Sequence, residues 1–457
     1  MSARVRAAAG AARAAGALSR VAGQGGGTTL PGHVLLRLAP HGLGELAAEL
    51  PDGVVAVSAT NGKTTTSAML SHILESDRVV CRNGAGANLL SGVASSLVHR
   101  PAGAAVGVLE VDEAALPAVA AAVRPRALVL GNLFRDQLDR HGELEMVADR
   151  WRSMATTLDG STTLVLGADD PVIDALGDGA PAVLRFGIDD PDVALAATDS
   201  AADSTFCVRC GAPYAYAAVY LGHLGAYRCP AGDHARGSLD VVARDVRLDG
   251  VEGSTFRADT PEGSAEVRLL LPGLYNVENA LGAIAAAHVL DVPLPVAAER
   301  LATFSAAFGR FERLGVDGRE LVLILCKNPT GANEALRAIA EDLAGRQVLL
   351  GLNDGVADGR DVSWIWDVDF EGRIERAAGV TCTGNRAADM ALRLRYAGLP
   401  VDGIGRMVNL EDALDDVVAA TEPGERVYAL ATYTAMLELH GIVSGRGLTA
   451  PYWEGAR

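Results

Sequence analysis

The sequence predicts an α/β protein with a doubly wound, mostly parallel sheet, a small inserted module and a second α/β domain at the C-terminus. Short apolar segments alternate along the chain with Ala- and Leu-rich segments of helical length. This alternation is typical of parallel sheets that are covered by helices. At 457 residues the chain is also too long for one hydrophobic core, so two or three domains are expected.

Composition narrows the range of partners and compartments. The net charge of −17 argues against nucleic acid, whose phosphates need a basic surface. Six cysteines are too few for a disulfide scaffold in a chain of this length, and no apolar run is long enough to cross a bilayer. We therefore expect a cytoplasmic protein.

The N-terminal arm, residues 1–48, opens with a basic, Ala-rich segment. It lacks the apolar block of a secretory signal. One interpretation is a helix that packs on the domain behind it, which the small alanine face favours. The other is an amphipathic helix that makes peripheral contact with the inner face of the membrane.

The first predicted domain covers residues 49–314. Its clearest strands are expected at 54–59, 107–113, 127–133 and 162–170, and a helix follows the first of them. The pattern breaks at about 195–240, and we interpret residues 200–240 as an inserted module. Residues 269–290 return to a strand, a turn and a helix.

The second predicted domain covers residues 315–457, after the segment FGRFERLG. Its apolar segments LVLILCKN, QVLLGLN, GVTCTGN and RVYALATY are expected to be strands of a second α/β series.

The segment ATNGKTTT is the strongest chemical signal in the sequence, because a buried strand precedes it and a helix follows it. Backbone N–H groups at such a turn cradle phosphates, a lysine neutralises their charge, and a hydroxyl can ligate Mg²⁺. The full pattern G-x-x-x-x-G-K-[ST] is not met, and Ala59 stands where a shorter form would have its first glycine. The predicted ATP-binding residues are Thr60, Asn61, Gly62, Lys63, Thr64 and Thr65.

Carboxylates should lie beside this loop. Glu110 ends a predicted strand that would neighbour the loop in a doubly wound sheet, so we expect it to be catalytic and to hold Mg²⁺ together with Thr64. Asp112 and Glu113 are second candidates. A solvated acidic strand end is the alternative.

Seven further segments extend the pattern along the chain: CRNGAGANLLSG, LEVDEAALP, FRDQLDRHGE, GADDP, LPGLYNVENALGA, GRFE and the C-terminal ADGRDVSWIWDVDFE. With T-N-G-K-T they resemble the Mur ligases and their folylpolyglutamate synthetase relatives. The C-terminal segments resemble the MurT family, the Mur-ligase-like subunits of lipid II isoglutaminyl synthase. The resemblance implies a Mur-ligase central domain that uses ATP and Mg²⁺.

The resemblance also implies nucleotide contacts for Asn276 and Arg310, although an asparagine at a helix start is more often a cap. Asn279 is weighted lower. In the loop near the acceptor, Arg135, Asp136 and His141 are all candidates to face substrate. No lysine matches the carbamylated lysine of many Mur ligases, so a second Mg²⁺ stays open.

The cysteines Cys207, Cys210 and Cys229 resemble an incomplete zinc ribbon, since structural zinc takes four ligands. The MurT family usually offers two cysteine pairs, and here the fourth cysteine is missing. We expect His234 to replace it in a structural Cys₃His site, with His223 and Asp233 as further candidates. The alternative is a degenerate ribbon without metal.

By the same resemblance, the partner is the glutamine amidotransferase subunit GatD, which needs an acid from MurT to orient its histidine. We assign that catalytic acid to Asp361, with Asp358 as second choice and turn capping as the alternative. Tryptophans beside this acidic loop suit a partner surface.

The expected reaction is ATP-dependent amidation of the α-carboxylate of D-glutamate in the lipid II stem peptide, through an acyl phosphate and with ammonia from the partner. One alternative is a self-contained ligase that adds an amino acid. The other is a non-catalytic nucleotide-binding scaffold.

Overall fold

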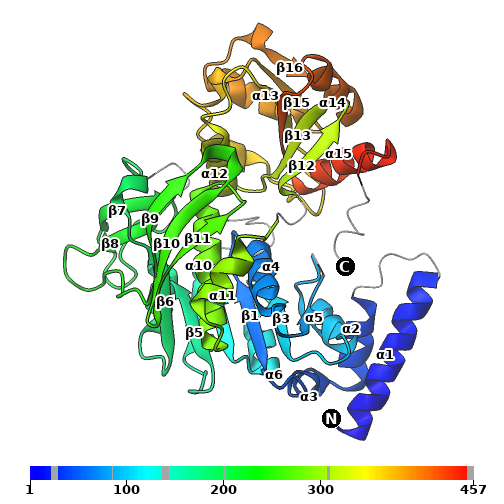
Figure 1. Ribbon diagram of the computed structural model, residues 1–457, viewed down its shortest axis with the longest axis vertical. Coiled ribbons are helices and arrows are strands. Elements are labelled where there is room, and N and C mark those ends of the chain that lie inside the picture. The colour runs from blue at the N-terminus through cyan, green and yellow to red at the C-terminus, as the bar shows by residue number, and fades with distance from the viewer. Residues whose placement is uncertain (22–28, 85, 136–143, 199–201, 306–308, 450–457) are drawn as a thin grey trace.

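The computed structural model describes residues 1–21, 29–84, 86–135, 144–198, 202–305 and 309–449. Two sheets dominate it (Figure 1). The first has nine strands in the order β11-β10-β9-β6-β5-β4-β1-β3-β2. Every pairing from β2 to β9 is parallel, whereas β10 and β11 are antiparallel. This confirms the predicted doubly wound, mostly parallel sheet.

The strands of this sheet are β1 (Val54–Ser58), β2 (Val80–Arg82), β3 (Val106–Glu110), β4 (Ala127–Leu130), β5 (Thr163–Gly167), β6 (Val183–Ile188), β9 (Val241–Leu248), β10 (Ser254–Thr260) and β11 (Gly263–Leu269). Its helices are α4 (Lys63–Leu74), α5 (Leu90–Val98), α6 (Leu116–Val123), α8 (Leu144–Ala155), α9 (Pro171–Asp174), α10 (Leu274–Val289) and α11 (Leu294–Leu301), with the short 3₁₀ turns η1 (Ala175–Gly177), η2 (Pro191–Val193) and η3 (Gly250–Glu252). All five residues of β1 are buried, as expected for a central parallel strand covered on both faces.

The second sheet has six strands in the order β12-β13-β17-β14-β15-β16, and only β12 is antiparallel to its neighbour. Its elements are β12 (Arg310–Val316), β13 (Arg319–Leu325), α12 (Pro329–Ile339), β14 (Gln347–Gly351), η4 (Ser363–Asp367), η5 (Ile374–Arg376), β15 (Gly379–Thr383), α13 (Ala387–Tyr396), η6 (Val401–Gly403), β16 (Ile404–Arg406), α14 (Leu410–Ala419), β17 (Arg426–Ala431) and α15 (Tyr433–Gly445). The sheet therefore starts at Arg310, a few residues before the predicted boundary at 315.

A small module lies between β6 and β9 along the chain. Its two strands, β7 (Ala215–Leu221) and β8 (Leu224–Arg228), form a separate antiparallel sheet. Four of its residues, Cys207, Tyr214, Tyr227 and Cys229, form a hydrophobic cluster of their own. The module matches the insertion expected at 200–240 in position.

The N-terminal arm is helical, with α1 (Ala3–Val21), α2 (Leu30–Leu38) and α3 (Gly42–Ala47). Helix α1 buries Val5, Ala8, Ala9 and Ala12 in the same core cluster as residues of α2 and α5. Its apolar face is thus covered by protein, as the packing interpretation expects. Among the described residues, no helix combines the length and the apolar character that a membrane span requires.

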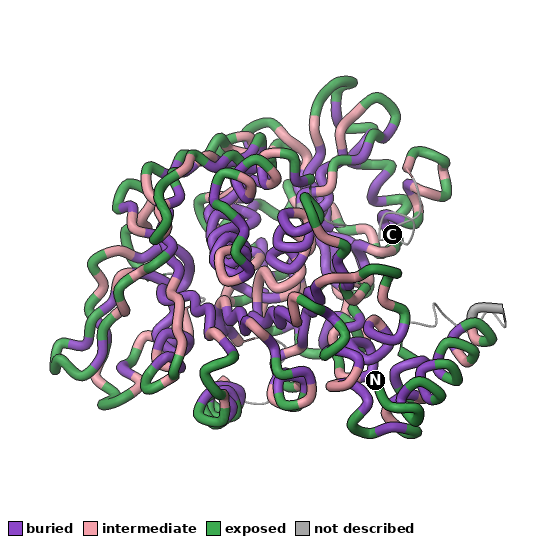
Figure 2. Tube along the Cα trace, turned by 60° about the horizontal axis from the view of Figure 1, so that its bottom comes forward, coloured by how far each residue is buried: buried purple, intermediate pink, exposed green. Residues whose placement is uncertain are grey.

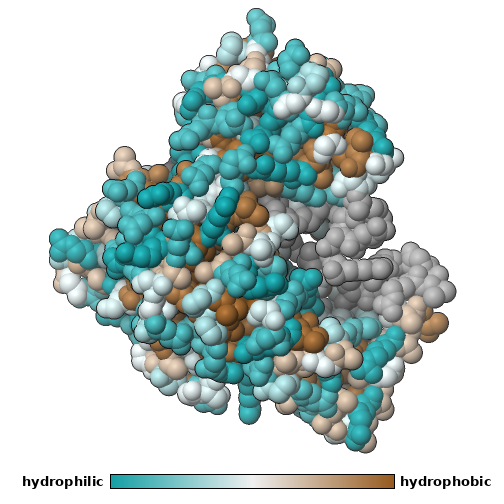
Figure 3. All heavy atoms as spheres, viewed as in Figure 1, coloured by the Kyte–Doolittle hydropathy of each residue, from teal (hydrophilic) through white to brown (hydrophobic). Residues whose placement is uncertain are grey.

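The two domains are in direct contact with each other. Figure 2 shows buried segments running through the centre and exposed segments along the rim. Val251, in η3 of the first domain, is buried within the core cluster of the second domain. On the face in Figure 3 the hydrophobic residues form small separate groups, and the surface around them is mostly hydrophilic.

Candidate active site

The phosphate loop has the predicted strand, turn and helix. Strand β1 ends at Ser58, and α4 begins at Lys63 after Gly62, whose φ is 90°. A Cβ atom on Gly62 would lie 1.9 Å from Oδ1 of Asn279. Glycine is therefore required here twice, by the left-handed backbone and by the close approach of α10.

Asn132, which follows β4, fixes the loop from the side. Its side chain accepts from the backbone N–H of Asn61 at 2.9 Å and donates to the Asn61 carbonyl at 3.1 Å. The Thr60 hydroxyl accepts from Phe134 N at 3.0 Å. Sequence reasoning did not single out Asn132, although its place after a strand that pairs with β1 could have pointed to it.

Glu110 is the last residue of the strand next to the loop, and Glu113, just beyond it, contacts the lysine. Lys63 Nζ lies 3.3 Å from Glu113 Oε2 and 3.1 Å from the Ala59 carbonyl. Glu110 pairs in register with Val57, which confirms the predicted position of its strand beside the loop. Its Oε1 accepts from Asn88 at 3.3 Å. Glu113, weighed only as a second candidate, is the carboxylate in direct contact with Lys63.

Asn276 and Asn279, near the start of α10, are joined by a hydrogen bond between their side chains. Asn276 donates to the Pro272 carbonyl at 2.7 Å and accepts from Asn279 at 3.1 Å. Asn279 Oδ1 in turn accepts from the Thr66 hydroxyl at 3.3 Å. The side chain of Asn276 thus positions Asn279, and Asn279 lines the interdomain pocket.

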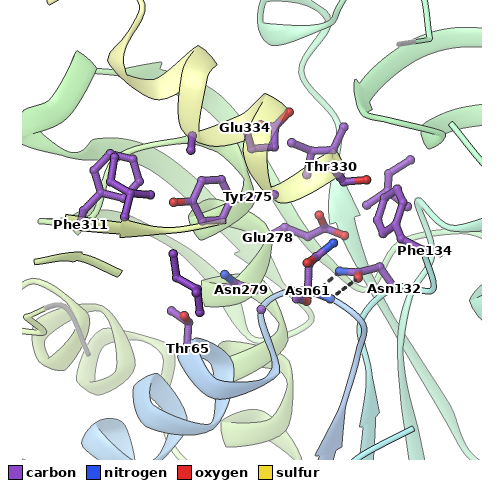
Figure 4. A pocket seen from close by; sticks show the side chains of 17 residues that line it. Asn61, Thr65, Asn132, Phe134, Tyr275, Glu278, Asn279, Phe311, Thr330 and Glu334 are labelled. Carbon is purple, nitrogen blue, oxygen red and sulfur yellow. Dashed lines mark hydrogen bonds between the residues drawn. The ribbon is translucent and has the colours of Figure 1, made fainter. Parts of the chain in front are cut away.

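That pocket lies above the loop, between the two domains (Figure 4). Asn328, the N-cap of α12, reaches across the boundary and donates to Asn61 Oδ1 at 2.9 Å. The lining combines apolar and polar side chains from both domains: Asn61, Thr65, Asn132, Phe134, Leu221, Leu224, Tyr275, Glu278, Asn279, Phe311, Ile324, Leu325, Thr330, Glu334 and Ala335. Such a pocket, open to a phosphate loop, suits a nucleotide.

The remaining predicted contacts of this region divide into two groups. The side chain of Arg310 and residues Asp136 and His141 lie outside the described residues. Arg135 is described, and it lies 2.7 Å from Asp203 and 3.6 Å from Asp367. It therefore links the insertion to the C-terminal domain.

The cysteine cluster forms only in part as expected. The thiols of Cys207, Cys210 and Cys229 lie within 4.8 Å of one another, which fits the chemistry of a thiolate metal site. His234 is not part of this group of converging ligand atoms. Its Nδ1 lies 2.6 Å from the Tyr214 hydroxyl. His223 is also engaged elsewhere, with Asp170 at 3.4 Å.

The two candidate acids of the C-terminal loop differ in their surroundings. Asp358 is buried and accepts from Thr434 N at 2.7 Å, Thr434 Oγ1 at 2.5 Å and Gly355 N at 3.1 Å. Asp361 is exposed, and hydrogen bonds from Ser363 lower its pKa. Asp361 therefore caps a turn and also presents a charged carboxylate to solvent.

Family models match both domains. The Mur ligase middle domain matches residues 57–220, and the MurT ligase C-terminal domain matches residues 325–436. The chain is 33% identical to the lipid II isoglutaminyl synthase (glutamine-hydrolysing) subunit MurT of Streptococcus pneumoniae, over 92% of this chain and 93% of that protein. It is 30% identical to the subunit of the same name from Staphylococcus aureus strain N315, over 82% and 84%.

Solved structures agree on the fold. A pseudomurein peptide ligase type C from Methanothermus fervidus has a TM-score of 0.69 at 21% identity, covering 88% of this chain and 80% of that one. MurF from Acinetobacter baumannii has a TM-score of 0.66 at 19% identity, covering 90% and 80%. With the sequence relatives, these findings show that the chain belongs to the MurT family of Mur-ligase-like proteins.

Proposed function

We propose that this chain is the synthetase subunit of a lipid II isoglutaminyl synthase. It uses ATP to amidate the α-carboxylate of D-glutamate in the lipid II stem peptide, which gives D-isoglutamine. The observation that carries the proposal is the phosphate loop beside an interdomain pocket, with Lys63 paired to Glu113 and Glu110 on the adjoining strand. MurT relatives support the substrate.

The chemistry starts from a poor electrophile. A carboxylate oxygen attacks the γ-phosphorus of ATP, so that an acyl phosphate forms and ADP leaves. Ammonia then attacks the acyl carbon, a C–N bond replaces the C–O bond, and the departing phosphate takes the surplus proton. Lys63 and the N–H groups at the start of α4 stabilise the charge on the transferred phosphoryl group.

The proposed function includes two metal ions. Thr64 and Glu110 would hold Mg²⁺, which offsets the charge of the nucleotide phosphates. Glu113 orients Lys63 through their ion pair. Cys207, Cys210 and Cys229 would hold a structural zinc ion, and its fourth ligand would come from outside the group of three thiols, to which His234 does not belong.

The nitrogen source is the glutamine amidotransferase GatD. The exposed carboxylate of Asp361 would orient the histidine of that partner, as the acid does in a nucleophile–His–acid arrangement. Asp358 does not suit this role, because its oxygens are occupied by Thr434 and Gly355.

The test is ADP release by the complex purified with its amidotransferase. We expect release to require lipid II together with glutamine or ammonium, and the product to be about 1 Da lighter than lipid II because NH₂ replaces OH. Lys63→Ala should abolish release while the complex still assembles. Release supported by free amino acids without the partner would show the amino-acid-adding ligase instead. No release under any condition would overturn the proposal.

A further inference from the structure

Glu278 is the only acidic residue of helix α10. Helix α10 reads LYNVENALGAIAAAHV, and nearly all of it is buried. The Glu278 side chain is 4% exposed, and its Oε1 has no hydrogen-bond partner among the described residues. It points into the interdomain pocket toward Asn61 and Thr330 (Figure 4). A buried carboxylate without a partner is costly, so its retention needs a reason.

Three carboxylates act on Glu278, although one of them, Asp169, is paired with Arg236 at 2.7 Å. Burial raises its pKa well above the ordinary range, and the nearby charges of Asp169, Asp170 and Glu334 raise it further. Asp169 and Asp170 follow β5, whereas Glu334 comes from α12 of the other domain and pairs with Arg337 at 2.9 Å. The carboxylate form of Glu278 is therefore disfavoured unless a cation lies beside it, so a small cation at Glu278 would be stabilised.

The pocket adjoins the phosphate loop. Helix α12, which lines the pocket, also contacts the segment that follows the Asp361 loop. The amide Nδ2 of Asn61 is buried in the loop without a hydrogen bond among the described residues. On the other side, Asn333 of α12 bonds Asp369, at 2.8 Å to its N–H and 3.5 Å to its carboxylate. Asp369 follows η4, which itself follows Asp361. Helix α12 thus connects the Asp361 loop with the wall that carries Glu334.

We propose that Glu278 holds the nitrogen of the incoming ammonium and ammonia beside the phosphate loop, next to the nucleotide that the same pocket would bind. The apolar side chains of Phe134, Leu221 and Leu224, which line the same pocket, would exclude water from this position. The inference rests on the proposed function and adds a positioning residue to it.

Every proton released by ammonium is accounted for in the proposed reaction. Ammonium enters opposite the Glu278 carboxylate, and one proton passes from nitrogen to Glu278. The ammonia that remains attacks the acyl phosphate, and its surplus proton leaves with phosphate. Glu278 returns its proton to water when the product departs, so the residue is regenerated in each turnover.

The test separates the two nitrogen sources in the complex with the amidotransferase. For Glu278→Gln we expect unchanged glutamine hydrolysis and a drop of about tenfold in amide formed per glutamine hydrolysed. The KM for added ammonium should rise by about tenfold, and saturating ammonium should restore kcat. Glu278→Asp should recover part of the coupling. Glu299→Gln, on an exposed position of α11, is the matched control and should change neither value.

Three results would overturn the inference. Glu278→Gln could couple as well as the wild type, or lose kcat equally with both nitrogen sources, or raise the KM for ATP and leave that for ammonium unchanged. Thermal unfolding of the variant at or above the wild-type temperature excludes a folding defect as the cause. If the wild-type complex released no ADP with either source, the proposed function itself would fail, and this outcome is distinct from the other three.

Discussion

Gly62 shows how one residue joins the local turn to the tertiary packing. Its positive φ suits the turn before α4, and the missing side chain leaves room for Asn279 from α10. These two requirements can be separated, because other glycines of the chain have a positive φ but open space around them.

Gly62→Ala should abolish productive nucleotide binding. The left-handed backbone costs an alanine about 1–2 kcal/mol, and the clash with Asn279 displaces the loop as well. Gly103→Ala is the matched control, since Gly103 has a φ of 76° and open space within 4 Å of the position that an alanine Cβ would take. Both variants should lose unfolding free energy by urea titration. Only Gly62→Ala should lose affinity for ATP by calorimetry, and equal ATP binding would contradict this account.

Substitution by asparagine should affect a different property at Asp358 than at Asp361. Asp358→Asn removes charged acceptors from Thr434 and Gly355 and should destabilise the fold by about 1–3 kcal/mol. Asp361→Asn should leave stability within about 0.5 kcal/mol, because its side chain is exposed. Its effect should appear as lost glutaminase activity of the complex. Chemical denaturation and glutamate release measure the two effects, and a fully active Asp361→Asn complex would remove the residue from the partner's site.

Glu278 should make the free energy of unfolding depend on pH, in a direction that its raised pKa determines. Its pKa is raised in the folded state, chiefly by burial and then by Asp169, Asp170 and Glu334, so between the unfolded and folded pKa values the native state binds more protons. The contribution of Glu278 to the free energy of unfolding should therefore be fully present below the ordinary pKa range of glutamate and should be lost as the pH rises above it. Glu278→Gln cannot titrate and should lack this slope. Urea unfolding from about pH 4 to about pH 9 compares the two proteins, and parallel curves would show that burial does not raise this pKa.

At the scale of elements, the stability of the β7–β8 module depends more on its side-chain cluster than on the pairing of its two strands. Two short strands are marginal alone, and the hydrophobic cluster there contains only a few residues. Three converging thiols offer the additional stabilisation that a bound metal would provide.

The metal content of cysteine and histidine variants tests this module. We expect about one zinc ion per chain in the wild type and loss of zinc in Cys207→Ser. His234→Asn should keep its zinc, because His234 is not part of the group of three converging thiols. Cys382→Ser, at a buried thiol outside the cluster, is the control. Elemental analysis by mass spectrometry measures each ratio, and a wild type without zinc would indicate a degenerate ribbon.

At the scale of the whole molecule, the site exists only while the two domains are docked. Asn328 bonds the phosphate loop, and η3 inserts Val251 into the C-terminal core. The contact is reinforced by Arg313, which donates to the Val251 carbonyl at 2.7 Å, and by an ion pair of Arg426 with Glu252 at 3.2 Å.

Val251→Asp should separate the domains without unfolding either one, because a buried unpaired charge is costly. We expect an increase in the radius of gyration by small-angle scattering and a KM for ATP raised by about tenfold or more. Val401→Asp, at an exposed valine of the C-terminal domain, serves as the control. An unchanged radius and KM would show that the η3 contact does not hold the domains together.

The sequence by itself determined the features that local pattern encodes. Apolar runs and turn residues predicted strands β1, β3, β4 and β5 and the C-terminal strands β13, β14, β15 and β17, together with the phosphate loop, and the order of motifs predicted the family. The other strands were not singled out, because short segments of mixed polar and apolar residues carry little periodic signal.

Only the tertiary structure decided which side chains meet. Glu113 instead of Glu110 contacts Lys63, Asn132 fixes the loop, Glu278 enters the pocket and His234 turns to Tyr214. Each of these contacts joins separate segments or depends on the path of a loop. They follow from strand order, register and domain docking, which are collective properties of the folded chain and leave no local mark in the sequence.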